Sequence, residues 1–425
     1  MLDRTKAPEV RPFGQLILPQ EEVITLSNGL VLHTLCGGDQ DVARLDLVAE
    51  GGPGDCENPC VATFAAELLR EGNKSTDNEA IADIIDYNGA WFNSSSSGHF
   101  TTLQLSALTS KLDSLTPLLI ECFTAPTFPE DAFKIIRAKG VSRQKLNLSR
   151  VSFLANADNR RMMAGPDHPE ARIPSIEEIS NISRESLIDF HNSIVNASRT
   201  HAYLCGRFTT GLVDSLCRRL ELIPSDNTPS PIKIRPFSSL PPAQSTIKKA
   251  GSLQSAVVMS LPAVSRSHPD YNALRMTVTA LGGYFGSRLM MNIREDKGYT
   301  YGISAALLGS REGSYISISA QCDNRYTSAL IDEVRAELRR MANEPLSNEE
   351  LRKLKFNVAS DLASTLDSPM TVMDYYELRR SVGIPDDYFY ARQATVDSLT
   401  PETVCRLSRQ YLDPAQLRIS IAGDL

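Results

Sequence analysis

Residues 281–301 read Leu-Gly-Gly-Tyr-Phe-Gly-Ser-Arg-Leu-Met-Met-Asn-Ile-Arg-Glu-Asp-Lys-Gly-Tyr-Thr-Tyr, and the rest of the chain is best interpreted from this stretch. Glycine fills three of its first six positions, and glycine permits close backbone approach or a positive φ. An apolar helical turn follows, and the stretch ends with Arg294, Tyr299 and Tyr301. The pattern predicts a loop that feeds a short helix and then two tyrosines, an arrangement more specific than ordinary surface.

The length and composition of the chain indicate a soluble protein of at least two domains. Its 425 residues exceed the roughly 250–300 at which a single core stops growing. A net charge of −7 argues against nucleic acid and anionic membranes as partners, because such surfaces need clustered Lys and Arg. No run approaches the ~20 apolar residues of a membrane span, so we expect none.

The cysteines and the first residues bear on the compartment. The eight cysteines are scattered and form no pair of CxxC units, so neither a zinc site nor a disulfide framework is indicated. The sequence begins without the apolar core of a signal peptide. These features favour the cytoplasm, and a periplasmic location stays open if a signal peptide has been removed.

The first half of the chain alternates strand and helix patterns. Strands at 23–26 and 30–33 flank Ser27-Asn28-Gly29, which is a hairpin signal. We then expect strands at 42–48 and 101–108 and helices at 60–69, 78–87, 111–123 and 129–147. Because each of these helices needs a sheet to cover, the fold class is α+β.

An internal duplication divides the chain into two domains. Residues 182–208 and 399–425 both read as an N-capped helix, a loop, a strand and a glycine. A linker rich in Pro and Ser at 224–244 separates the predicted domains 1–223 and 245–425. In the second half we expect strands at 255–261 and 314–321 and helices at 269–281, 329–341 and 347–366, the last with a capping box.

Several motifs occur in an order that resembles one protein family. They are Leu281-Gly-Gly through Ser287-Arg288-Leu289, Ile293-Arg294-Glu295 to Lys297-Gly298, Tyr301, His168-Pro169 leading to Ile176–Ile179, and the glycines Gly206 and Gly423. Together they resemble the insulinase and pitrilysin-like metallopeptidases, the inverted zincins, in their small two-domain form. The resemblance covers nearly the whole chain. It implies two homologous α+β domains, each with an antiparallel-dominated sheet covered by helices on one side, facing each other across a chamber.

The zinc motif of that family is missing from this sequence. Active members carry H-x-x-E-H on a helix of the first domain, and the matching positions here are Thr63, Ala66 and Glu67. No two of the six histidines stand four residues apart. The region of the third ligand has no acidic residue between Asp131 and Asp158 but is rich in Lys and Arg, which disfavours a dication. We therefore expect no catalytic residue, metal or cofactor on this chain alone.

The second-domain motif survives, and the resemblance implies that Arg294 and Tyr301 bind substrate. In active relatives an Arg and a Tyr from the half without zinc reach the substrate backbone near the scissile bond. A guanidinium supplies fixed donors for a peptide carbonyl, and a phenol can donate to a carbonyl or a developing oxyanion. The alternatives are a salt bridge from Arg294 to Glu295 or Asp296, and simple strand packing for Tyr301.

The leading hypothesis is a non-catalytic subunit of a heteromeric zinc peptidase. A zinc-bearing peptidase subunit of the same family would be the partner, a peptide or unfolded polypeptide the substrate, and no activity is expected from this chain alone. The polar run 93–97 matches an edge strand that pairs with substrate in active relatives, although a solvated edge is equally compatible. The rival is a non-enzymatic scaffold or peptide-binding protein, either a homodimer or a chain like the core subunits of a respiratory complex.

Overall fold

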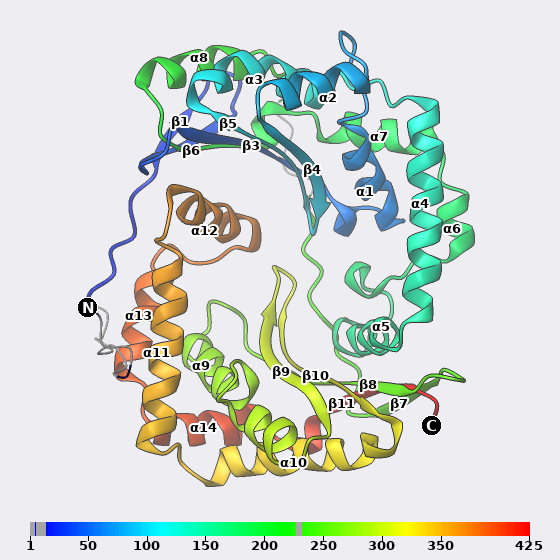
Figure 1. The fold of residues 1–425 in the computed structure, drawn as a ribbon, viewed down its shortest axis with the longest axis vertical. Helices are drawn as coiled ribbons and strands as arrows, with labels where there is room; N and C mark the ends of the chain where they lie inside the picture. The colour runs from blue at the N-terminus through cyan, green and yellow to red at the C-terminus, as the bar shows by residue number, and fades with distance from the viewer. Residues whose placement is uncertain (1–4, 6–13, 227–231) are drawn as a thin grey trace.

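The computed structural model describes residue 5 and residues 14–226 and 232–425, and it consists of two β-sheets with helices around them (Figure 1). The first sheet has the strand order β1-β2-β6-β3-β5-β4 and the second the order β7-β11-β8-β10-β9. The strands are β1 Glu22–Thr25, β2 Val31–Cys36, β3 Val42–Glu50, β4 Trp91–Ser97, β5 Phe100–Leu108, β6 Thr200–Gly206, β7 Gln244–Lys248, β8 Gln254–Pro262, β9 Thr300–Gly309, β10 Ser314–Asp323 and β11 Arg418–Gly423.

The two halves repeat one topology, which confirms the predicted α+β fold with two homologous parts. The order β2-β6-β3-β5-β4 corresponds strand by strand to β7-β11-β8-β10-β9. Each sheet has one parallel pair, β2 with β6 and β7 with β11, and its other pairs are antiparallel. The duplicated stretches are a helix and a central strand of each half.

Helices cover the outer face of each sheet (Figure 1). The helices of the described residues, on either face, are α1 Pro59–Leu68, α2 Asn78–Tyr87, α3 Thr109–Thr124, α4 Glu130–Ser149, α5 Val151–Ala164, α6 Ile176–Ser180, α7 Arg184–Ile194, α8 Thr210–Leu220, α9 Tyr271–Gly282, α10 Thr327–Asn343, α11 Asn348–Ser364, α12 Pro369–Val382, α13 Tyr388–Ser398 and α14 Pro401–Tyr411. Within the described part of the chain, no helix has the length and apolar character that a membrane crossing requires.

Two helices are exchanged between the halves. α12, which lies between α11 and α13 of the second half in the sequence, packs against β6 and β2 of the first sheet. α5, from the first half, packs against β8 and β11 of the second sheet. On α5, Ala155 is fully buried with Ala256 and Val258. The side-chain amide of Asn159 donates to the backbone carbonyls of Val258 and Arg418 over 3.2 and 3.1 Å. The inner faces of the sheets therefore carry helical cover in addition to the expected cover outside.

The segment between the halves is irregular where the structure describes it. Residues 232–241 form no strand or helix, and β7 begins at Gln244. Residues 227–231 of the predicted linker lie outside the described residues. The division into domains at 224–244 stays a prediction.

Candidate functional site: the segment from α9 to β9

Residues 283–299 connect helix α9 to edge strand β9. α9 ends at Gly282, where a Cβ atom would lie 2.7 Å from the Cβ of Ala305, so glycine is needed for the close approach of helix and strand. The short helix that follows is a π-helix, Met290–Asp296. Gly298 then takes a φ of +65°, and β9 starts at Thr300. π-Helical turns are rare in proteins, and those that occur often lie at functional sites.

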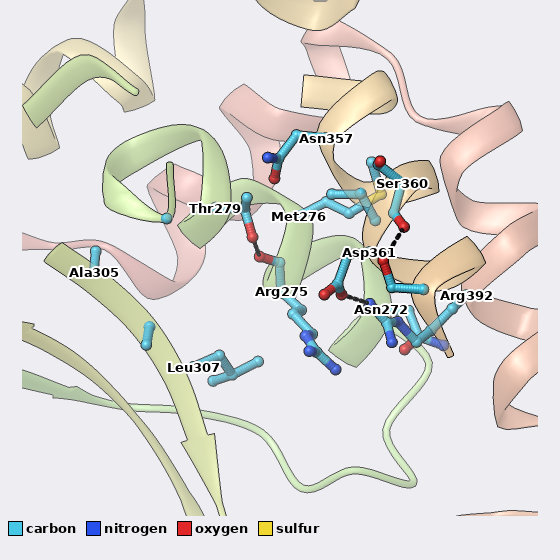
Figure 2. Close-up of a pocket in the computed structure, with 14 residues that line it drawn as sticks. Asn272, Arg275, Met276, Thr279, Ala305, Leu307, Asn357, Ser360, Asp361 and Arg392 are labelled. Carbon is cyan, nitrogen blue, oxygen red and sulfur yellow. Dashed lines mark hydrogen bonds and ion pairs between the residues drawn. The ribbon is translucent and has the colours of Figure 1, made fainter. Parts of the chain in front are cut away.

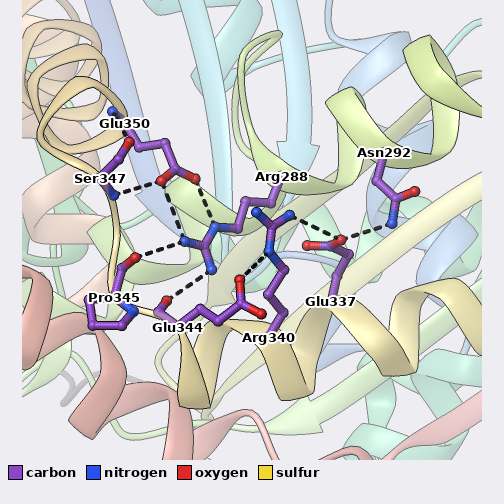
Figure 3. A network of polar contacts seen from close by, with 8 residues as sticks. All are labelled: Arg288, Asn292, Glu337, Arg340, Glu344, Pro345, Ser347 and Glu350. Carbon is purple, nitrogen blue, oxygen red and sulfur yellow. Dashed lines mark hydrogen bonds and ion pairs between the residues drawn. The ribbon is translucent and has the colours of Figure 1, made fainter.

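A polar network fixes the π-helix to the neighbouring helices (Figure 3). The guanidinium of Arg288 is 5% exposed, donates from Nε to Glu350 over 2.8 Å and from Nη1 to the Glu344 carbonyl over 3.1 Å. Asn292 donates to Glu337 over 2.8 Å. Burial opposes ionisation of Glu350, but the hydrogen bond from Arg288 prevails and lowers its pKa to about 2. The segment is thus anchored at two points before it reaches Arg294.

A β-bulge at the start of β9 turns Tyr301 outward. Ile303 pairs with Ala320 and Thr300 pairs with Cys322, so the two residues Tyr301 and Gly302 face a single residue of β10. The Thr300 hydroxyl holds the bulge, since it donates to a β10 carbonyl over 2.6 Å and accepts from the Gly302 N–H over 3.1 Å. A regular strand would direct Tyr301 to the same face as Ile303, into the core. In the bulge its side chain is 93% exposed.

Tyr301 lines an open pocket of about 650 Å³ between α5 and the inner face of the second sheet. Helix α5 contributes Ser152 and Asn156, and β8 contributes Ala256 and Val258. The remaining lining comes from Gln254, Met290, Thr300–Ser304 and Ser319–Gln321. The pocket combines polar hydroxyl and amide groups with an apolar floor, which suits a polypeptide backbone.

Arg294 lies near this pocket in the sequence but does not line it. Its guanidinium is 3.3 Å from the Glu295 carboxylate and 4.8 Å from the ring centroid of Phe285. The side chains of Arg294 and Glu295 are 34% and 40% exposed. Tyr299 stacks on Tyr326 at a centroid distance of 4.9 Å. Tyr299 therefore packs against another aromatic ring, and Arg294 forms an ion pair with Glu295 of the same chain.

The tip of the β9–β10 hairpin is attached to the first half by a histidine between two carboxylates. Nδ1 of His99, between β4 and β5, lies 2.8 Å from Asp55, and Nε2 hydrogen-bonds to Glu312 at the hairpin tip. Hydrogen bonds to Asp55 and Glu312 raise the pKa of His99 to about 9. Burial opposes the charge on Glu312, yet the bond to His99 lowers its pKa to about 2. The ion pair joins the two halves beside the strand that carries Tyr301.

The positions that match the zinc motif are occupied by groups that do not fit a zinc ion. On α1 the Thr63 hydroxyl donates to the Pro59 carbonyl, Ala66 is fully buried, and the Glu67 carboxylate lies 3.3 Å from the guanidinium of Arg143. Among the described residues, no three or more His, Cys, Asp or Glu side chains lie together so that they could hold a metal. Glu67, the one acidic residue at the motif positions, is therefore paired with Arg143 of α4.

The polar run 93–97 lies in β4, which is an edge strand of the first sheet. Its Ser94 hydroxyl donates to the Ala66 carbonyl over 2.6 Å, so this edge lies directly beside α1. Peptide contact along β4 remains a prediction.

Sequence reasoning missed three contributors to the site. Thr300 and Gly302 build the bulge, and Phe285 packs on Arg294. The signal for the bulge was present, because a glycine inside a strand pattern often marks one. No local sequence pattern indicated that α5 lines the pocket beside Tyr301, because this depends on which sheet the helix covers.

The two-sheet fold is shared with solved structures of M16-like proteins. Residues 181–358 match the family described as the peptidase M16 inactive domain. An uncharacterized zinc protease of Mycobacterium leprae is 26% identical over 254 residues, which are 58% of this chain and 56% of the relative. Another from Streptomyces coelicolor is 25% identical over 40% of this chain. The matched parts span 56% and 37% of those two relatives.

Solved structures share the fold over the whole chain. A peptidase M16 inactive domain from Pseudomonas fluorescens superposes with a TM-score of 0.86 at 22% identity, covering 95% of this chain and 98% of its own. A protease from Helicobacter pylori also reaches 0.86, at 19% identity, covering 96% and 100%. The periplasmic protease PqqL of Escherichia coli scores 0.77 at 18% identity, covering 99% of this chain and 49% of its own. This chain is thus similar to half of that longer protein.

Proposed function

We propose that this chain is the non-catalytic subunit of a heteromeric zinc metallopeptidase. A partner chain of the same family holds the zinc, and Arg294 and Tyr301 of this chain bind the backbone of a peptide or unfolded polypeptide. The positions matching the zinc motif do not fit a metal, so the zinc, when present, supplies water activation from the partner. This chain alone has no peptidase activity.

The observation that carries the proposal is the outward side chain of Tyr301 at an anchored β-bulge. A side chain that is 93% exposed buries almost no apolar surface, so its position adds little to stability. The bulge, the Thr300 hydroxyl and the Arg288 network nevertheless hold its backbone beside a pocket of about 650 Å³. A rigid segment that presents an exposed donor meets the requirement for orienting a substrate carbonyl.

Arg294 takes part by exchanging its intrachain partner for substrate. Its ion pair with Glu295 is about one-third exposed on both sides and contributes roughly 0–1 kcal/mol, so little free energy opposes the exchange. The face of Phe285 keeps the guanidinium oriented through a cation–π contact. In the closed assembly, where water is excluded, a bidentate bond to a peptide carbonyl or carboxylate replaces Glu295.

Mixing the purified chain with a relative that carries the H-x-x-E-H motif, from the same organism, tests the proposal. Light scattering reports association, and a fluorogenic peptide library reports cleavage. We expect a hetero-oligomer that cleaves peptides, with each chain inactive alone. Chelator-sensitive cleavage by this chain alone would contradict the proposal. A mixture that neither associates nor cleaves supports the alternative, a non-enzymatic scaffold or peptide-binding protein.

A further inference from the structure

A second pocket, of about 540 Å³, lies on the helix-covered side of the second sheet (Figure 2). It is enclosed by α9, α11, α13 and β9, on the side of β9 where Ala305 and Leu307 point. The pocket that Tyr301 lines has a separate set of lining residues. A volume of this size is in the range of roughly 300–1,000 Å³ that holds small molecules in proteins.

The charges in this pocket are not balanced by the protein. Arg392 donates to Asp361 over 2.9 Å, which pairs the one carboxylate of the lining with one guanidinium. Arg275 donates to the hydroxyl of Tyr388 over 3.1 Å, and within the described ranges it forms no ion pair. Figure 2 draws the bond between Asp361 and Arg392. The lining thus carries two guanidiniums and one carboxylate, and a bound anion would balance the excess positive charge.

A second, independent feature of the pocket is an unsatisfied acceptor. The side-chain oxygen of Asn272 is buried and has no hydrogen-bond partner among the residues that the structure describes. Asn272 stands one helical turn before Arg275 on α9, and both line the pocket. A ligand that satisfies both must therefore carry an anionic group and, a few ångströms away, an N–H or O–H donor. Met276 and Leu307 supply apolar surface for its carbon skeleton.

We infer that this pocket binds a small organic anion that also carries a hydroxyl or amino group. Its carboxylate or phosphate lies against the guanidinium of Arg275, and its donor reaches the oxygen of Asn272. Carboxylates and phosphates share the oxygen geometry that a guanidinium fork recognises, so either can fill the anionic position. The inference rests on this pocket alone and does not depend on the peptidase proposal.

Titration calorimetry on the full chain tests the site with three probes. L-Lactate and glycerol 3-phosphate each combine an anion with a hydroxyl, whereas acetate has a carboxylate and no donor. We expect saturable binding of lactate or of glycerol 3-phosphate, and the one that binds shows whether the anionic group is a carboxylate or a phosphate. Acetate should bind at least tenfold more weakly. The site is refuted if neither hydroxyl-bearing probe binds saturably. Equal binding of acetate would contradict the role of Asn272.

Two variants separate ligand binding from folding. Arg275→Met removes the charge at similar length, and Arg352→Met is the matched control, because Arg352 is an exposed residue of α11 that does not line the pocket. We expect Arg275→Met to lose at least tenfold in affinity and Arg352→Met to bind like the parent. Without ligand, Arg275→Met should melt slightly below the parent, since the hydrogen bond to Tyr388 is lost. Unchanged affinity contradicts the inference.

Discussion

Removing the charge of Glu312 should weaken the attachment between the two halves in a pH-dependent way. The variant is Glu312→Gln, which keeps the shape of the side chain. The side chains of His99 and Glu312 are 10% and 4% exposed, so solvent screens the pair only weakly. The pKa of His99 is raised from 6.5 to about 9, but Asp55 shares in that shift. Assigning half of the shift to Glu312, at 1.36 kcal/mol per pKa unit, gives a loss of about 2 kcal/mol.

The sign of the pH dependence follows from the two shifts. The raised pKa of His99 contributes stability that is complete below its unfolded value near 6.5 and is lost as the pH rises through about 9. The lowered pKa of Glu312 contributes stability that is complete above its unfolded value near 4.5 and is lost as the pH falls toward about 2. The pair therefore stabilises most between these unfolded values, near pH 5–6.

Urea unfolding of the parent and of Glu312→Gln at pH 6 and pH 10 measures this effect. We expect a difference of about 2 kcal/mol at pH 6 that shrinks toward zero at pH 10, where His99 is neutral in both proteins. Glu349→Gln is the control, because its exposed pair with Lys353 should leave both values almost unchanged. An equal loss at both pH values would refute the reasoning, since it would show that charge is not the cause.

Three further substitutions test the packing around the site. Arg288→Met leaves the Glu350 carboxylate without its partner, so urea unfolding should show a loss of about 3–5 kcal/mol, and a loss under 1 kcal/mol would contradict the anchoring role. Gly140→Ala places a Cβ 2.2 Å from the ring of Phe64, and we expect about 1–3 kcal/mol of destabilisation, seen as a lower melting temperature. Asn159→Leu removes the side-chain donor of α5 that hydrogen-bonds to two backbone carbonyls of the second sheet, and it should lower the free energy of unfolding by about 2–4 kcal/mol. Unchanged hydrogen exchange in β8 would contradict this expectation.

Local signals in the sequence predicted most elements of the fold. The Asn28-Gly29 turn joins β1 and β2, and Gly29 has the positive φ that such a turn requires. Ser347 and Glu350 form the expected capping box at the start of α11. These features depend on residues a few positions apart, so a single sequence is enough to find them.

Features that depend on distant contacts were not predicted. Arg44 and Asp46 alternate with apolar residues on β3, but both are buried, and Arg44 donates to Asp374 of α12 over 2.5 Å. Burial raises the pKa of Asp46 to about 6 although Arg44 lies beside it. The exchange of α5 and α12 between the sheets is set by tertiary packing, which the local pattern of neither helix reveals. The roles of Arg294 and Tyr301 stay predictions drawn from the family motif.

The central claim is that Tyr301 of this chain acts on a substrate held at the zinc of a partner. The most direct test is the initial rate of peptide cleavage by the mixed chains with Tyr301→Phe, compared with Tyr87→Phe, which alters an equally exposed tyrosine on α2. Loss of a donor to a developing oxyanion lowers the rate about 10²–10³-fold, so we expect a fall of that order for Tyr301→Phe and none for Tyr87→Phe. Equal rates for the two variants in an active mixture would contradict the account.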